Sequence, residues 1–349
     1  MAKKVASRIQ FYSEYNVNKE DVDMYALRLG SIFVMSLLLG ACNQSNNDTL
    51  ASSTRILTPQ VIVEFSASLS STTGTDQIAD ATLSADFDNT NILTGNIVLG
   101  NLSATTVTIR TGFAGQAGTL LKTLSMDSAN AWRIPRIPID QALADQLAAG
   151  GVYVQVETVS GDTLRGQFLS AGDILVVQTA MSSQQEVPVV TSSASAIAGL
   201  TINRQTGDLV AHITGAGVND ATAAHIHQGF AGTNGGVLVA LVQDATDPTH
   251  WMTANAEVLD ATRIAALDAG ELYLNLHTPA NPGGELRGQL APADVRVLFT
   301  ALSGTQEVPS VATAGTGLAA ITINTAASTI QAHVNSGNGL VAVAAHLHD

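Results

Sequence analysis

Residues 222–241 read TAAHIHQGFAGTNGGVLVAL and contain two short strand-like runs on either side of a glycine-rich stretch. Successive side chains of a strand point to opposite faces of its sheet. His225 and His227 therefore share one face, while Ala224 and Ile226 share the other. The segment predicts two strands joined by a glycine turn, with two imidazoles at the spacing of metal ligands.

The glycine-rich stretch and its counterpart GFAG at 112–115 look superficially like phosphate-binding loops. A phosphate loop also needs a Lys-Ser/Thr pair and a following helix N-terminus, and neither stretch is followed by them. We therefore interpret both stretches as turns between strands, where glycine supplies backbone conformations that other residues rarely adopt.

Several motifs recur along the chain with a period of about 120 residues. QEVP (185–188, 306–309) and AAHIH (223–227, returning as AAHLH at 344–348) repeat at an offset of 121 residues, and GFAG (112–115, 229–232) and LRGQ (164–167, 286–289) repeat as well. The repeats define module one (59–170), module two (174–291) and module three (296–349). Because module three stops one residue after its histidine pair, we expect either a truncated sequence or a fragment whose partner strands lie elsewhere, with an exposed apolar face.

Within each module the pattern is dominated by strands. TINRQTGDLVAHI (201–213) predicts a hairpin, and 81–99 in module one is its counterpart. One short helix is expected in each complete module, at 139–149 and 259–269, with Asp140 and Asp260 as N-caps. The expected fold class is all-β, with tandem antiparallel sandwich or barrel modules.

The N-terminal segment has the features of a secretion signal. The uncharged apolar run LGSIFVMSLLLGA (29–41) is too short to span a bilayer comfortably and has the length of a signal-peptide core. LGAC (39–42) resembles the lipobox of bacterial lipoproteins, which implies cleavage before Cys42 and acylation of its thiol. We expect residues 1–41 to be a signal peptide, with Met24 as an alternative start, and residues 42–58 to be a polar linker.

Three longer segments of module two carry a family resemblance: TAMSSQQEVPVV (179–190), the stretch at 222–241, and LYLNLHTPANPGGELRGQL (272–290). Together they resemble the CHRD domain, named from chordin. The resemblance extends through module three to its end and covers module one only in a degenerate form. It implies an immunoglobulin-like or copper/zinc superoxide dismutase-like β-barrel, without a settled biochemical activity.

The histidines suggest a metal site in module two. If the strand ending at His277 returns beside the strand of His225 and His227, the three imidazoles converge on one cation such as zinc or copper. Glu285 is an oxygen donor that could orient a ligand or complete the shell, and His346 and His348 are the module-three equivalents of the first pair.

The alternative for these histidines is a neutral hydrogen-bonded cluster without a metal. Module one carries Thr108, Arg110 and Glu157 at the aligned positions, so the framework itself does not require imidazoles. This absence favours a functional role in module two. Arg110 and Glu157 would equally suit an ion pair that replaces a polar histidine network.

Other recurring residues have structural interpretations. Glu186 and Glu307 of the QEVP motifs are expected to be solvated or salt-bridged. Arg165 and Arg287 fit a structural ion pair better than an anion site. Trp132 and Trp251, at matching places in modules one and two, are expected to anchor the cores; no serine lies in a nucleophile-elbow context.

Composition and charge narrow the function further. With 15 basic against 29 acidic residues the chain has a net charge of -14, and Lys122 is its only lysine beyond residue 19, which excludes nucleic acid as a partner. A superoxide dismutase needs a fuller ligand set than one module offers, so no enzyme activity is expected. Two hypotheses remain: a lipid-anchored envelope protein, in the outer membrane, whose modules bind an extracellular protein or glycan; and a metal-binding envelope protein that uses His225, His227 and His277 in oxidative or metal stress.

Overall fold

The computed structural model describes residues 62–71, 79–86, 91–99, 102–128, 131–170, 172–255, 257–337 and 339–348. The expected signal peptide, Met24, Cys42 and the linker to residue 58 lie outside these residues. No helix within the described ranges is long and apolar enough to cross a membrane.

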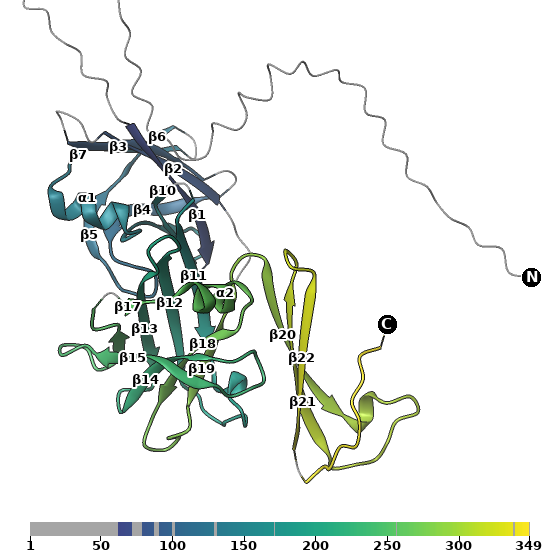
Figure 1. The fold of residues 1–349 in the computed structure, drawn as a ribbon. Helices are drawn as coiled ribbons and strands as arrows, with labels where there is room; N and C mark the ends of the chain where they lie inside the picture. The colour runs from purple at the N-terminus through teal and green to yellow at the C-terminus, as the bar shows by residue number, and fades with distance from the viewer. Residues whose placement is uncertain are drawn as a thin grey trace, which may run out of the picture. The chain divides into compact units, whose positions relative to one another are not determined.

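Module one contains a ten-stranded antiparallel sheet and one helix (Figure 1). The strands pair in the order β5-β4-β8-β9-β1-β2-β3-β7-β6, with β10 also paired to β1. The elements are β1 (Ile62–Ser71), β2 (Ala79–Asp86), β3 (Ile92–Val98), β4 (Ala104–Thr111), β5 (Thr119–Thr123), β6 (Ser125–Ser128), β7 (Ala131–Pro138), α1 (Gln141–Ala148), β8 (Val152–Thr158), β9 (Thr163–Gln167) and β10 (Leu169–Ser170).

Module two repeats this plan with a nine-stranded antiparallel sheet in the order β11-β12-β13-β16-β15-β14-β18-β19, with β17 paired to β13. An antiparallel bridge between Ser182 and Arg287 joins the two ends of the order, so the sheet nearly closes on itself. The elements are β11 (Ile174–Met181), the 3₁₀ turn η1 (Ser183–Gln185), β12 (Ser195–Asn203), β13 (Asp208–Ala216), β14 (Ala223–Gln228), β15 (Gly236–Gln243), β16 (His250–Met252), β17 (Glu257–Val258), α2 (Ala261–Asp268), β18 (Leu272–His277) and β19 (Leu286–Leu290). The expected all-β fold and the two hairpins are confirmed.

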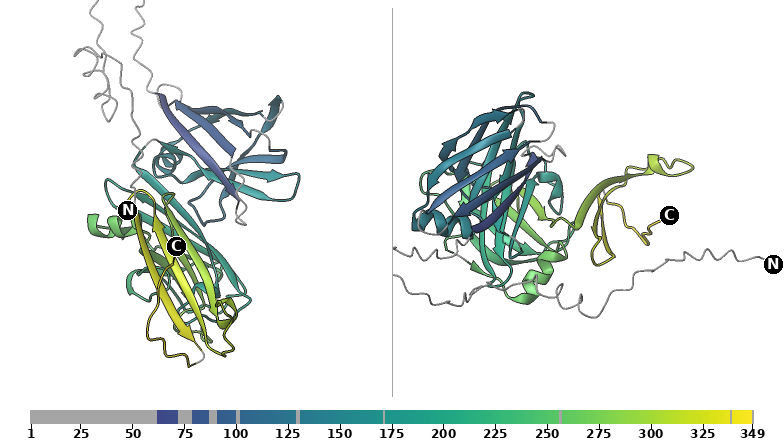
Figure 2. Two further views of the ribbon diagram at one scale, coloured as in Figure 1. Left: turned by 90° about the vertical axis from the view of Figure 1, so that its right-hand side faces the viewer. Right: turned by 90° about the horizontal axis from the view of Figure 1, so that it is seen from above.

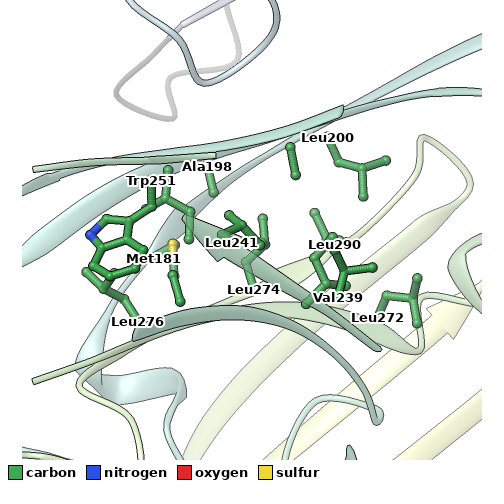
Figure 3. Packing of buried hydrophobic residues seen from close by; sticks show 14 of the residues in the cluster. Met181, Ala198, Leu200, Val239, Leu241, Trp251, Leu272, Leu274, Leu276 and Leu290 are labelled. Atoms are coloured by element: carbon green, nitrogen blue, oxygen red, sulfur yellow. The ribbon is translucent and has the colours of Figure 1, made fainter. Parts of the chain in front are cut away.

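Each complete module has its own hydrophobic core, formed by the alternate side chains that face inward. Trp132 and Trp251 are 7% and 6% exposed, which confirms them as core residues. Figure 3 shows Trp251, Met181 and Leu276 pointing into the space between the strands of module two. Strands with one apolar face therefore wrap around two separate cores.

The two helices form where the sequence predicts and have the predicted N-cap residues. The carboxylates of Asp140 and Asp260 accept hydrogen bonds from the backbone N–H groups of Leu143 and Arg263, at 2.8 and 2.9 Å. Such an N-cap contributes about 1 kcal/mol to helix stability. The observed helices are two residues shorter at the N-terminus and one residue shorter at the C-terminus than the predicted ranges.

Module three is an open three-stranded sheet of β20 (Val295–Ser303), β21 (Thr316–Asn324) and β22 (Thr329–Gly337) (Figure 2). The 3₁₀ turn η2 (Gly304–Gln306) lies between β20 and β21. Leu298 and Leu302 are 53% and 38% exposed, whereas the matching Val177 and Met181 of module two are 2% and 1% exposed. The face that forms the core of module two is thus uncovered in the described part of module three, as expected.

Candidate metal centre

The antiparallel pairing of β14 with β18 brings the three predicted histidines together. His225 lies opposite Asn275, His227 opposite Tyr273, and His277 opposite Ala223, the residue two positions before His225. Because these residues alternate along their strands, all three imidazoles lie on one face. One ring nitrogen from each histidine lies within 4.8 Å of the others.

Hydrogen bonds to backbone carbonyls orient two of the rings. The Nδ1 atom of His227 lies 3.0 Å from the carbonyl oxygen of Gly235, and Nδ1 of His277 lies 3.1 Å from that of Pro282. A carbonyl oxygen only accepts, so each Nδ1 carries the hydrogen and each Nε2 keeps its lone pair. This is the arrangement that outer hydrogen bonds give to metal-binding histidines.

The remaining contacts leave one lone pair unused. His277 Nε2 accepts from Nδ1 of His225 at 3.1 Å, whereas His227 Nε2 is buried and has no hydrogen-bond partner among the described residues. A buried acceptor without a partner costs about 1–3 kcal/mol. A neutral hydrogen-bonded cluster therefore accounts for two of the three imidazoles and leaves the third unsatisfied.

Burial keeps the histidines neutral. Desolvation lowers the pKa of His225, His227 and His277 below the ordinary value of 6.5. His227 is 8% exposed, and the other two rings are partly exposed. The site therefore offers neutral imidazoles, the form that binds metals, and stays accessible from solvent.

A stack of side chains supports His227. Its ring lies parallel to that of Tyr273, and the guanidinium of Arg287 lies over the Tyr273 ring, 3.6 Å from the ring centroid. The Tyr273 hydroxyl accepts from Gly235 N–H at 3.1 Å, and the carbonyl of the same glycine accepts from His227. Ring stacking and the glycine together fix the imidazole in place.

Module one contains the same framework without the imidazoles. Arg165 lies 3.5 Å from the centroid of Tyr153, and the Tyr153 hydroxyl accepts from Gly118 N–H at 3.1 Å. Arg110 takes the place of His227 and donates to the Gly118 carbonyl at 3.2 Å. The hydrogen bond that fixes the ring of His227 is thus available to an arginine, whereas the free Nε2 lone pair is specific to histidine.

The alternative of an Arg110–Glu157 ion pair is not observed in the described residues. Glu157 accepts instead from Gln155 and Thr163, both at 2.7 Å. Arg110 has its carbonyl partner, so each residue is satisfied separately.

Glu285 lies beside the site without pointing a free oxygen into it. Its carboxylate accepts from Ser192 at 2.6 Å, from Asn281 at 3.2 Å and from the Thr278 hydroxyl. Burial raises its pKa, but these three hydrogen bonds outweigh burial and lower it. Glu285 thereby braces the loop whose Pro282 carbonyl orients His277.

The histidine pair of module three is placed differently. His346 and His348 are exposed and lie outside any strand, with ring centroids 6.0 Å apart. In module two the equivalent segment is β14, which is held by β15 on one side and β18 on the other. No described strand of module three pairs with the segment at 344–348, so these imidazoles gather no third partner.

The recurring arginines do not form the expected ion pairs. Arg287 is fully buried and donates to the carbonyls of Phe230 and Thr233 at 2.9 and 2.7 Å, and Arg165 donates to loop carbonyls in the same way. Neither guanidinium hydrogen-bonds to a carboxylate among the described residues. Several convergent carbonyl dipoles surround each cation in place of an anion, and Nε of Arg287 is buried without a hydrogen-bond partner among the described residues.

Sequence reasoning missed the burial of Glu186. This carboxyl group is 3% exposed, and the Asn275 amide donates to it at 3.5 Å. Burial raises its pKa to about 7, and the charge of Arg287 only partly opposes this effect. The recurrence of QEVP was the available signal, but a glutamate before a turn gives no indication of what covers it.

A second histidine pair was also not foreseen, because His250 has no counterpart in the repeat. His212 Nδ1 lies 3.0 Å from His250 Nε2, and His250 Nδ1 lies 3.1 Å from Asp244. Burial lowers the pKa of His212 to about 4. The two histidines of this pair lie on β13 and β16, which belong to a different part of the sheet from β14 and β18.

These features define a protein built of tandem all-β modules, with a candidate histidine site in the second module. The chain belongs to the CHRD domain family, whose model matches residues 65–168 and 177–290, more than half of the chain. No curated protein and no solved structure matches it.

Proposed function

We propose that this protein is a non-enzymatic binding protein of the cell envelope and that module two binds zinc or copper through His225, His227 and His277. The observation that carries this proposal is the convergence of three ring nitrogens within 4.8 Å. The carbonyls of Gly235 and Pro282 support it, since they leave Nε2 of His227 and His277 without a proton. Nε2 of His227 has no partner in the described part of the chain, and a bound metal would replace the His225 N–H as the partner of Nε2 of His277.

The geometry needs only a small adjustment to accept a metal. Zinc–nitrogen bonds of about 2.1 Å in a tetrahedral site place the nitrogens about 3.4 Å apart. Small rotations of the partly exposed His225 and His277 would bring their nitrogens this close, while the Tyr273 ring holds His227 in place. Three protein ligands leave a fourth position for water or an external donor.

Metal analysis of the full-length protein, purified without a histidine tag, tests this proposal. We expect about one zinc or copper ion per chain, measured by mass spectrometry and by calorimetric titration with each ion. His227→Arg reproduces the state of module one, keeps a donor for the Gly235 carbonyl and is expected to abolish binding.

The double variant His346→Ala/His348→Ala is the matched control and should keep the metal. Absence of stoichiometric metal in the wild type, or its retention after all three site histidines are changed to Ala, contradicts the metal site and leaves the neutral cluster as the explanation.

The membrane anchor is a separate part of the proposal. A thioether-linked lipid and further acyl chains on Cys42 would tether the modules, because several chains together anchor stably whereas one anchors marginally. Asn43, in place of an aspartate, favours transfer to the outer membrane. Radiolabelled palmitate should enter the wild type and not Cys42→Ser; an unlabelled wild type would refute the anchor.

A second candidate function rests on the tandem repetition of the modules. Repeated modules on a lipid anchor suit the binding of an extracellular protein or glycan by avidity. Cells with and without the protein, compared for attachment to arrays of glycans and matrix proteins, test this function. Equal attachment of both cell types to every surface would contradict it.

A further inference from the structure

The GFAG loops at 112–115 and 229–232 make the same contact with the module that follows each of them. The Phe113 ring stacks on the His212 ring with centroids 6.1 Å apart and 13° between the planes. The Phe230 ring stacks on the His333 ring at 6.2 Å and 22°. A phenyl–imidazole pair thus recurs at two successive junctions.

A polar contact accompanies each ring pair. The Thr214 hydroxyl donates to the Gly115 carbonyl at 2.9 Å, and the Asn335 amide donates to the Gly232 carbonyl at 2.8 Å. Thr214 and Asn335 each lie two residues after the stacked histidine, on the same face of β13 and β22. Different side chains therefore donate to the carbonyl of the equivalent loop glycine at both junctions.

The last glycine of each loop is fitted to a small residue of the next module. A Cβ atom added to Gly115 would lie 2.6 Å from the backbone nitrogen of Gly199, and one added to Gly232 would lie 2.9 Å from the Cβ of Ala320. Both loop glycines have left-handed backbone conformations, with φ of +81° and +84°. A Cβ on Gly199 would lie 2.3 Å from the carbonyl carbon of Ala114. No side chain fits between the two backbones.

The buried arginines hold each loop in the conformation that makes this contact. Arg165 donates to the carbonyl of Gln116 at 2.6 Å and also to that of Phe113, and Arg287 donates to the carbonyls of Phe230 and Thr233. The loop is therefore shaped by its own module before it meets the next one, which lowers the entropy lost on docking.

We propose that the GFAG loop is a docking element that joins CHRD modules head to tail. Its partner is another module of the same kind, and three acceptor residues of that module recognise the loop. They are a small residue (Gly199 or Ala320), the histidine opposite it on the neighbouring strand (His212 or His333), and a hydrogen-bond donor two residues after that histidine (Thr214 or Asn335). This interaction surface goes beyond the proposed function and does not depend on a metal.

Module one lacks the recognition set. The strand register gives the equivalent positions: Ile97 lies opposite Trp132 in module one, and Ile213 lies opposite Trp251 in module two. Asn96 is therefore the equivalent of His212, and Val98 is the equivalent of Thr214. Thr82, opposite Asn96, takes the place of Gly199. Module one therefore donates a loop and carries none of the three acceptor residues, so the docked series has a direction.

Hydrogen–deuterium exchange of the full chain, read by mass spectrometry, tests the docking from both sides. Gly199→Ala lies in module two, and we expect it to raise exchange about tenfold in the loop at 112–116 of module one. Phe113→Ala lies in module one, and we expect a similar rise at 211–214 of module two. Gly236→Ala is the control, because no atom lies within 4 Å of its added Cβ.

A rise across the junction in both variants supports docking. If Gly199→Ala disrupts module two as a whole, Phe113→Ala still reports on the contact from the other side. Changes confined to the substituted module in the Phe113→Ala variant would overturn the proposal, as would equal effects from Gly236→Ala.

Discussion

The imidazole of His227 lies parallel to the phenol ring of Tyr273, with ring centroids 4.9 Å apart and an angle of 8° between the planes. The two residues are directly opposite on neighbouring strands, and the guanidinium of Arg287 lies over the same Tyr273 ring. This stack limits the rotation of one proposed metal ligand and leaves its Nε2 atom without a partner among the described residues.

Tyr273→Leu should weaken zinc binding about tenfold, because removing a group that orients a metal ligand typically has an effect of this size. Tyr273→Phe keeps the stacked ring and should retain most of the affinity. Calorimetric titration, with folding checked by circular dichroism, measures both. Tyr153→Leu makes the matching change in module one and should leave the affinity unaltered; wild-type affinity in Tyr273→Leu would show that the stack does not position the ligand.

Module one should gain a metal site when its three aligned residues become histidines. Arg110 lies opposite Tyr153 as His227 lies opposite Tyr273, and Glu157 lies opposite Thr106 as His277 lies opposite Ala223. The triple variant Thr108→His/Arg110→His/Glu157→His should therefore raise the bound metal from about one to about two ions per chain. Elemental analysis gives the number, and a folded variant that still binds one ion would show that the strand framework is not sufficient.

Glu186→Gln should change how stability depends on pH. The folded pKa of about 7 exceeds the ordinary value of 4.5, so the folded state favours the protonated form. The associated stability is fully present below about pH 4.5 and is lost as pH rises through 7, by about 3 kcal/mol in total.

The glutamine variant lacks this titration, so it should gain stability over the wild type as pH rises from 4.5 to 8. Urea unfolding of both proteins in chelator measures the difference curve and removes the contribution of other groups, such as His212, whose lowered pKa acts in the opposite direction. Parallel curves would mean that Glu186 is ionised in the folded protein.

Arg287→Met should destabilise module two by about 3 kcal/mol, since it leaves the carbonyls of Phe230 and Thr233 without their donor in a buried setting. Arg287→Lys should restore little of the lost stability of module two, because an ammonium group cannot reproduce the planar fork of donors of a guanidinium. Differential scanning calorimetry measures the loss. Arg165→Met serves as the counterpart and should act on module one; a cost below about 1 kcal/mol in both would argue against a structural role of these cations.

Local pattern was sufficient to predict the strands, the two hairpins and the helix caps. Asp140 and Asp260 cap their helices because the capping bond joins residues only three apart. The common face of His225 and His227 follows from strand alternation alone. The approach of His277 was conditional, because it depends on which strands pair, and that pairing joins segments 52 residues apart.

The surroundings of charged groups were not predictable in the same way. Glu186 and Glu307 have identical motifs, yet Glu186 is buried and Glu307 is exposed. The difference lies in what covers the turn. In module two, the Asn275 and Arg287 strands lie against Glu186, and the described part of module three has no equivalent strands.

The sequence by itself determined the repeated all-β modules, the family, the helix ends and the facing of the histidine pair, because each depends on short-range periodicity or on motif identity. Only the tertiary structure decided that β18 pairs with β14, that the Gly235 and Pro282 carbonyls turn the lone pairs of His227 and His277 toward one point, and that the GFAG loops meet the next module. These features depend on register and burial. Both are set by contacts between distant segments, whose free energies no local pattern contains.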